Sequence, residues 1–136
     1  MSSDAEIKLY KTLADAGDAA AQNRLGLISQ NGEGVEQDYA EAIKWYLKAA
    51  EQRSAVAQYN LGLMYSRGLQ DYAEAARWFL KSAEQGIADA QFNFGLILEE
   101  GRGVKQDPDS AAVWYSEAAE QGHAEAQLRL DNMNNK

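Results

Sequence analysis

The chain has 136 residues and a formal net charge of −8, from 21 acidic and 13 basic residues, and it contains no cysteine. The lack of cysteine excludes disulfides, thiolate zinc sites and cysteine nucleophiles, and the acidic surplus argues against nucleic-acid binding, which needs a basic face. No run of about 18 apolar residues is present, so the sequence predicts no membrane span.

The chain starts with the polar residues Met1, Ser2, Ser3 and Asp4, which do not form a signal peptide. The sequence as it stands therefore predicts a cytoplasmic protein. A periplasmic location is the alternative, if a signal peptide has been removed.

An internal repeat organises the chain. The dipeptide Ala-Gln recurs at steps of 36, 33 and 36 residues, and the four copies are Ala21-Gln22, Ala57-Gln58, Ala90-Gln91 and Ala126-Gln127. An aromatic pair of Trp followed by Tyr or Phe recurs in the same order, at Trp45-Tyr46, Trp78-Phe79 and Trp114-Tyr115. Periods of this length are typical of helical repeat arrays.

In chain order, the repeat predicts a lone helix over residues 4–17, helix pairs over residues 18–53, 54–86 and 87–122, and a capping helix over residues 123–136. In each pair the first helix begins near Ala-Gln and ends at Gly32, Gly68 or Gly101. The second helix begins after an aspartate that can accept free backbone N–H groups. These aspartates are Asp38, Asp71 and Asp107, and Pro108 suits the first helical position.

Recurrent glycines predict special backbone positions. Gly17, Gly86 and Gly122 are expected to end the second helices in a left-handed conformation. Gly26, Gly62 and Gly95 lie inside the first helices, where glycine costs about 1 kcal/mol relative to alanine. Their recurrence at one register predicts a close approach that leaves no room for a side chain.

The second repeat departs from this pattern. Its turn spans three positions from Gly68 to Asp71 instead of six, and Leu69 is expected to replace Val35 and Val104 of the other turns. Arg53 occupies a position where the other repeats have glycine, which predicts either a strained left-handed residue or a different helix end.

A single helix pair cannot cover its own apolar face, so the fold class predicted is an all-α superhelical solenoid of antiparallel helix pairs in one domain. The sequence resembles the Sel-1-like repeat family, relatives of tetratricopeptide repeats. The resemblance is carried by residues 57–65 (AQYNLGLMY), Gly68, Asp71-Tyr72, Trp78-Phe79 and residues 101–107 (GRGVKQD). It implies a right-handed solenoid that acts as an adaptor or scaffold, and some members resemble immunity proteins that neutralise secreted antibacterial toxins such as phospholipases.

The candidate binding surface is the face of the first helices opposite their Ala–Leu stripe. We expect its centre at Asn23, Leu27, Tyr59, Leu63, Phe92, Leu96 and Leu128, and its rim at Gln30, Asn31, Ser66, Arg67, Glu99 and Glu100. Aromatic anchors surrounded by polar groups are typical of protein-binding hot spots. The alternative is that these residues only pack neighbouring first helices together.

No catalytic, cofactor or metal site is predicted. The single histidine, His123, is expected to lie alone in a surface loop, and the glycine-flanked turns lack the features of phosphate loops. The sequence thus predicts a monomeric, non-enzymatic module that binds a protein or peptide. An acidic surface favours a basic partner, although it can serve solubility alone. The alternative function is an immunity protein that inhibits a secreted effector.

Overall fold

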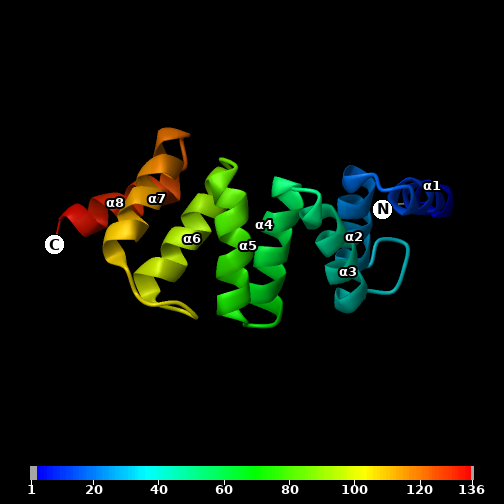
Figure 1. Ribbon diagram of the computed structural model, residues 1–136, viewed down its shortest axis with the longest axis horizontal. Coiled ribbons are helices and arrows are strands. Elements are labelled where there is room, and N and C mark those ends of the chain that lie inside the picture. Colours follow the sequence, from blue (N-terminus) through cyan, green and yellow to red (C-terminus); the bar gives the residue numbers. More distant parts are fainter. Residues whose placement is uncertain (1–2, 136) are drawn as a thin grey trace. The chain divides into compact units, whose positions relative to one another are not determined.

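The computed structural model describes residues 3–135, and within that range every regular element is helical (Figure 1). The predicted polar start at Met1 and Ser2, and the last residue Lys136, lie outside the described residues. The elements in chain order are α1 (Asp4–Asp15), α2 (Ala19–Asn31), α3 (Tyr39–Glu51), α4 (Ala55–Leu63), the π-helical turn η1 (Met64–Gly68), α5 (Tyr72–Glu84), α6 (Ala88–Glu100), α7 (Pro108–Glu120) and α8 (Ala124–Asn134). The predicted all-α class is confirmed.

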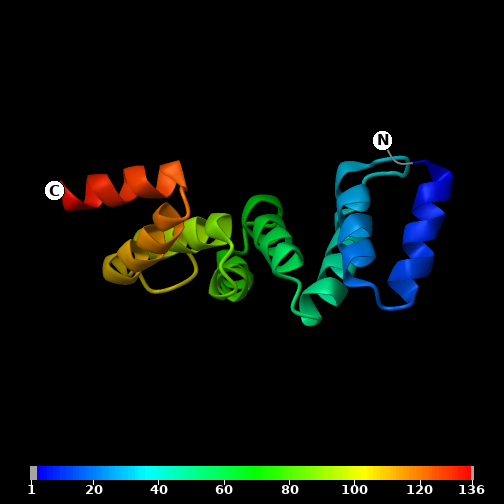
Figure 2. The same ribbon diagram turned by 90° about the horizontal axis from the view of Figure 1, so that it is seen from above.

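The helices form two compact units, the first ending at Leu61 and the second beginning at Gly62. In the first unit α1 and α2 run side by side in opposite directions, and α3 returns along α2 (Figure 2). Their shared core is made of Ile7, Ala14, Ala21, Leu25, Ile28 and Trp45, all buried. In the second unit α6 packs against both α5 and α7, and α7 packs against α8.

The predicted helix starts are confirmed. The carboxylates of Asp38, Asp71 and Asp107 accept the backbone N–H groups of Glu41, Glu74 and Ser110 at 3.1, 3.2 and 3.1 Å. Pro108 is the first residue of α7, where the missing N–H has no helical partner to lose. These caps set where each second helix begins.

The glycines inside the first helices lie against aromatic rings of the second helices. A Cβ on Gly26, Gly62 or Gly95 would overlap the ring of Tyr46, Phe79 or Tyr115 respectively. The predicted close approach is therefore confirmed, and the group that needs the space is a ring of the partner helix within the same repeat.

The glutamines of the first three Ala-Gln pairs join successive repeats. Gln22 and Gln91 are buried, and their side-chain amides donate to the carbonyls of Ala14 and Ala83 at 3.0 and 3.2 Å. Gln58 makes the same contact with Ala50. Each first helix is thus tied to the end of the second helix before it, across the turn that glycine or Arg53 closes. The pairing explains why a polar residue recurs at a buried position.

The first helix of the second repeat ends at Gly68, as predicted, but through a π turn. Gly68 is the last residue of the π turn and is not left-handed, whereas Gln70 has a φ of 54°. Leu69 is 55% exposed, more than Val35 at 39%. The closing hydrogen bond is nevertheless retained, because the Asp71 N–H donates to the Tyr65 carbonyl at 2.7 Å, as the Asp38 N–H does to Ser29 at 2.8 Å. The connection in repeat 2 is three residues shorter, and the widened last helical turn still brings Asp71 to the position that Asp38 has in repeat 1.

Arg53 has a φ of 68°. The strained left-handed alternative predicted for this position is therefore confirmed. Gly17, Gly86 and Gly122 have φ of 99°, 95° and 90°, as expected for residues that end a helix.

Candidate protein-binding surface

The predicted surface residues fall into two sets, one in each unit. The first set is Asn23, Leu27, Gln30, Asn31 and Tyr59, and the second is Leu63, Ser66, Arg67, Phe92, Leu96, Glu99, Glu100 and Leu128. We describe each set by itself, starting with the first.

In the first unit most of the predicted residues are half-buried. The Asn60 amide donates to Asn23 Oδ1 at 2.9 Å, which links the predicted face of α2 to α4. Gln30 is occupied internally, because its Oε1 accepts the Tyr46 hydroxyl at 2.6 Å. This bond anchors a buried ring, and the Gln30 side chain itself is half-buried.

Tyr46 and Tyr115 occupy equivalent positions in their two repeats. Burial raises the pKa of the Tyr46 hydroxyl, and the nearby Glu33 carboxylate adds to the rise. Burial is also the largest cause of the raised pKa of Tyr115, and its hydrogen bond to the Glu99 carboxylate is the second. Both hydroxyls thus stay neutral and act as donors, each to the residue four positions after the mid-helix glycine.

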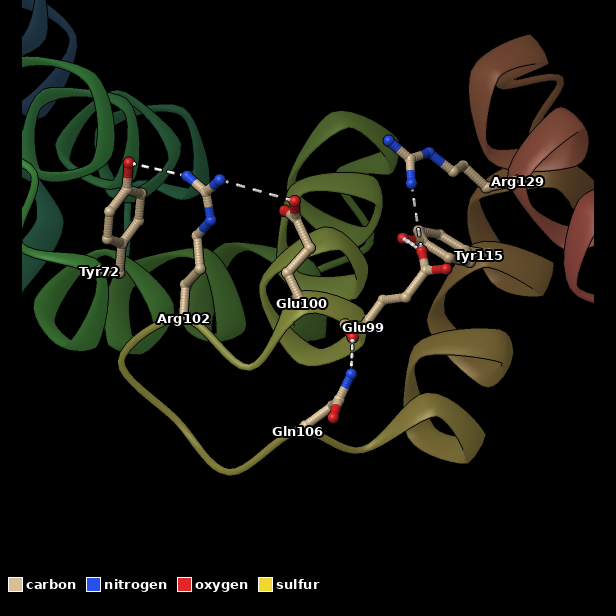
Figure 3. Close-up of polar contacts among 7 residues, drawn as sticks. All are labelled: Tyr72, Glu99, Glu100, Arg102, Gln106, Tyr115 and Arg129. Atoms are coloured by element: carbon tan, nitrogen blue, oxygen red, sulfur yellow. Dashed lines mark hydrogen bonds and ion pairs between the residues drawn. The ribbon is translucent and has the colours of Figure 1, made fainter.

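Glu99 is the hub of a polar cluster in the second unit (Figure 3). Its Oε1 accepts the Tyr115 hydroxyl at 2.6 Å and lies 3.5 Å from Arg129 Nη1, and its backbone carbonyl accepts the Gln106 amide at 2.8 Å. The Glu99 side chain is consequently directed to internal partners.

Phe92 is buried, with 9% of its surface exposed. Its ring stacks on His123 with centroids 4.6 Å apart and lies 5.9 Å from the ring of Tyr115. The structure thus places this predicted aromatic anchor between α7 and the start of α8. Tyr59 is half-buried and Leu128 is 61% exposed.

His123 does not lie alone in a surface loop, so that expectation is wrong. Its Nδ1 accepts the Ala126 N–H at 3.1 Å and caps α8, and its Nε2 lies 3.0 Å from Asp89 Oδ1. The side chain is only 13% exposed. The ring takes the capping position that Asp18 and Ser54 hold at the starts of α2 and α4.

Four predicted residues line one pocket of about 170 Å³ in the second unit, namely Ser66, Arg67, Leu96 and Glu100. The other lining residues, not predicted for this surface, are Tyr72, Phe79, Asn93, Ile97 and Arg102. Arg102 is part of the pocket lining because the loop after α6 folds back on α5. Its Nη1 donates to the Tyr72 hydroxyl at 3.0 Å, and its Nη2 lies 3.7 Å from Glu100 Oε2 (Figure 3).

Within residues 3–135 no group of three or more His, Asp or Glu side chains is arranged to hold a metal ion. In the same part of the chain no helix is both long and apolar enough to cross a membrane.

Paired helices, with a capped second helix and a mid-helix glycine against a ring, recur along the chain. The Sel1 repeat profile matches residues 19–54, 55–87 and 88–123. The chain belongs to the Sel1 repeat family. Members of this family are generally non-catalytic scaffolds.

Several relatives share these repeats over part of their length. Protein sel-1 homolog 2 of Mus musculus is 40% identical over 65 residues, which are 48% of this chain and 9% of that protein. Chitin synthase regulatory factor 2 of Schizosaccharomyces pombe is 37% identical over 62 residues, 46% of this chain and 12% of that protein. The matched segments are thus about a tenth of these curated relatives.

Solved structures agree with the Sel1 repeat fold. A Sel1 repeat protein from Oxalobacter formigenes superposes with a TM-score of 0.87 at 38% identity, covering 93% of this chain and 54% of that one. A protective antigen of uropathogenic Escherichia coli that displays an SLR fold gives a TM-score of 0.85 at 40% identity, over 89% of this chain and 27% of that one. The predicted solenoid class of antiparallel helix pairs is confirmed.

Proposed function

We propose that this chain is a non-enzymatic interaction module that binds a protein or peptide on the exposed face of its first helices. The observation that carries the proposal is the pocket at Ser66, Arg67, Leu96 and Glu100. Four of its lining residues were expected on this face, and the lining combines the apolar side chain of Leu96 with the charged groups of Arg67, Glu100 and Arg102. Polar rims around apolar centres are typical of protein-binding surfaces.

The net charge of −8 supports a basic partner overall. Long-range attraction between oppositely charged surfaces speeds encounter and is weakened by salt, since the screening length falls to about 8 Å at physiological ionic strength. Association that slows as salt is added would support this part of the proposal. An association rate independent of salt would assign the acidic charge to solubility.

The proposal is tested by affinity purification from the native cell with the chain as bait, followed by mass spectrometry. The test variant is Arg67→Glu with Leu96→Gln, which changes charge and apolar contact on the proposed face. The control is Val113→Asn on α7, which is 60% exposed and outside the pocket. Circular dichroism shows whether each variant keeps its helices.

We expect a protein that the wild type and Val113→Asn retain and the double variant loses. A partner retained equally by all three proteins would reject this face as the binding surface. The identity of the partner then separates an adaptor from an immunity protein, because a secreted toxin among the retained proteins would favour the second function. Phe92→Ala is unsuitable as a test, since Phe92 supports the packing of α8.

A further inference from the structure

The pocket in the second unit is lined by Ser66 and Phe79 of repeat 2, the repeat that lacks a contact found in the other two. In repeats 1 and 3 the tyrosine that fills the space below the mid-helix glycine donates its hydroxyl to the side chain four residues beyond that glycine, Gln30 or Glu99. In repeat 2 the equivalent residues are Phe79 and Ser66. Phe79 has no hydroxyl, and the short Ser66 side chain donates to the Leu63 carbonyl of its own helix at 3.3 Å.

The backbone around this position is also exceptional. Ser66 and Arg67 lie in the π turn η1, and Gln70 shortly after it has a left-handed φ of 54°. Single π turns inside helices are rare and frequently occur at functional sites. The shorter connection to Asp71 is the physical cause of the widened turn, and its consequence is that Ser66 and Arg67 both face the space between Phe79 and α6.

The lining of the pocket defines what it can bind. Leu96 is the half-buried apolar side chain of the lining, and it lies over the buried side chains of Phe79 and Ile97. The volume of about 170 Å³ is close to that of cavities known to hold a benzene ring, about 150 Å³. One aromatic side chain therefore fits. A smaller aliphatic group would leave part of the apolar surface in contact with water.

The charges at the pocket edge do not cancel. The Glu100 carboxylate forms an ion pair with Arg102. The Arg102 guanidinium also donates to the Tyr72 hydroxyl, and its carbon lies 5.1 Å from the centroid of the Tyr72 ring. Arg67 forms no ion pair with any residue in the described part of the chain. A guanidinium beside an apolar pocket is well suited to a carboxylate, which it can bind through two hydrogen bonds.

We propose that this pocket is the specificity site of the binding surface, and that it takes an aromatic side chain of a partner segment whose neighbouring Asp or Glu pairs with Arg67. This inference rests on the proposed function and refines it. The partner segment is locally acidic even where the partner as a whole is basic, because the pocket edge carries the opposite sign to the chain.

The test uses peptides selected from a library of random linear sequences displayed on phage, with the full chain as bait. We expect the enriched peptides to share an aromatic residue adjacent to Asp or Glu. The affinity of one enriched peptide, labelled with fluorescein, is then measured by fluorescence polarisation. The same peptide with Gln in place of its acidic residue tests the contact with Arg67.

The decisive variant is Ser66→Gln with Phe79→Tyr, which introduces the pair found in repeat 1 and adds atoms to two residues that line the pocket. We expect it to weaken peptide binding by at least about tenfold while the melting temperature is maintained. The control is Val113→Asn on α7, which is exposed and outside the pocket and should leave the affinity unchanged. Arg67→Gln should weaken the binding of the acidic peptide and leave the binding of its Gln version unchanged.

If peptides bind the variant with Ser66→Gln and Phe79→Tyr as tightly as they bind the wild-type chain, the inference is overturned but the interaction function is left intact. Enriched peptides that lack the aromatic and acidic pair, or a library that yields no enrichment, would overturn it as well. The proposed function fails separately, when affinity purification from the native cell retains no protein.

Discussion

A Cβ atom placed on Gly95 would lie 2.6 Å from Cε1 of Tyr115. The Tyr115 ring is fully buried below this glycine, and its hydroxyl donates to Glu99 one helical turn further along α6. Ring and glycine therefore fix how closely α6 and α7 approach, and the hydroxyl fixes how the ring is oriented. The same relationship holds for Gly26 and Tyr46 in the first unit.

Gly95→Ala should destabilise the chain. Alanine is better than glycine in a helix by about 1 kcal/mol, but the new methyl group would displace a buried ring, and overpacking of this kind costs about 1–3 kcal/mol. We expect a lower melting temperature by circular dichroism. The control is Gly68→Ala, since Gly68 has no heavy atom within 4 Å of the added Cβ and no positive φ. A Gly95→Ala protein that is as stable as the control would show that the ring can move aside.

Gln91→Leu should cost about 1–3 kcal/mol, because it leaves buried hydrogen-bonding groups without a partner. The Gln91 amide donates to the Ala83 carbonyl, and its Oε1 accepts the Gln121 amide at 3.0 Å. The matched control is Gln127→Leu in the last Ala-Gln pair, where the side chain is exposed and bonds to Asp131 on its own helix. We expect the control to change the free energy of unfolding by less than about 0.5 kcal/mol. Urea denaturation measures both, and equal effects would contradict the role of glutamine in joining repeats.

Arg53→Gly should raise the melting temperature by a few degrees. A left-handed conformation costs a residue with a Cβ roughly 1–2 kcal/mol, and glycine removes that strain at the expense of greater freedom in the unfolded chain. Arg53→Ala separates the two contributions of this residue, because it removes the guanidinium and keeps the Cβ. We expect no gain for the alanine variant. A melting temperature that rises with alanine as much as with glycine would attribute the effect to the side chain.

His123→Ala should destabilise α8, since loss of an N-cap side chain costs about 1 kcal/mol. His123→Asn restores an acceptor for the Ala126 N–H but not the stacking on Phe92. The stability of this variant should therefore fall between that of the wild type and that of His123→Ala. In the wild type, the bond accepted by Nδ1 requires the proton of the neutral ring to be on Nε2, next to Asp89. Long-range ¹H–¹⁵N spectra report the tautomer directly, and a proton on Nδ1 would exclude the capping role.

Much of the helical framework could be predicted from the sequence because it depends on local rules. The aspartate caps, Pro108, the left-handed glycines and the strained Arg53 each follow from the conformational preferences of one residue and its immediate neighbours. The recurrence of Ala-Gln and of the mid-helix glycines also showed that helices pack closely. The family match confirms the fold that this spacing predicted.

The tertiary structure alone decided which side chains on the predicted binding face are available to a partner. Helical periodicity places Phe92, Gln30 and Glu99 on that face, but the ring of Phe92 is covered by His123, and Gln30 and Glu99 are engaged by tyrosines sixteen residues away. Such contacts depend on where a second helix brings its side chains, which no local pattern specifies. The pocket at Ser66 and Phe79 likewise required the positions of α5, α6 and the loop carrying Arg102, because an empty space is defined by all the atoms around it.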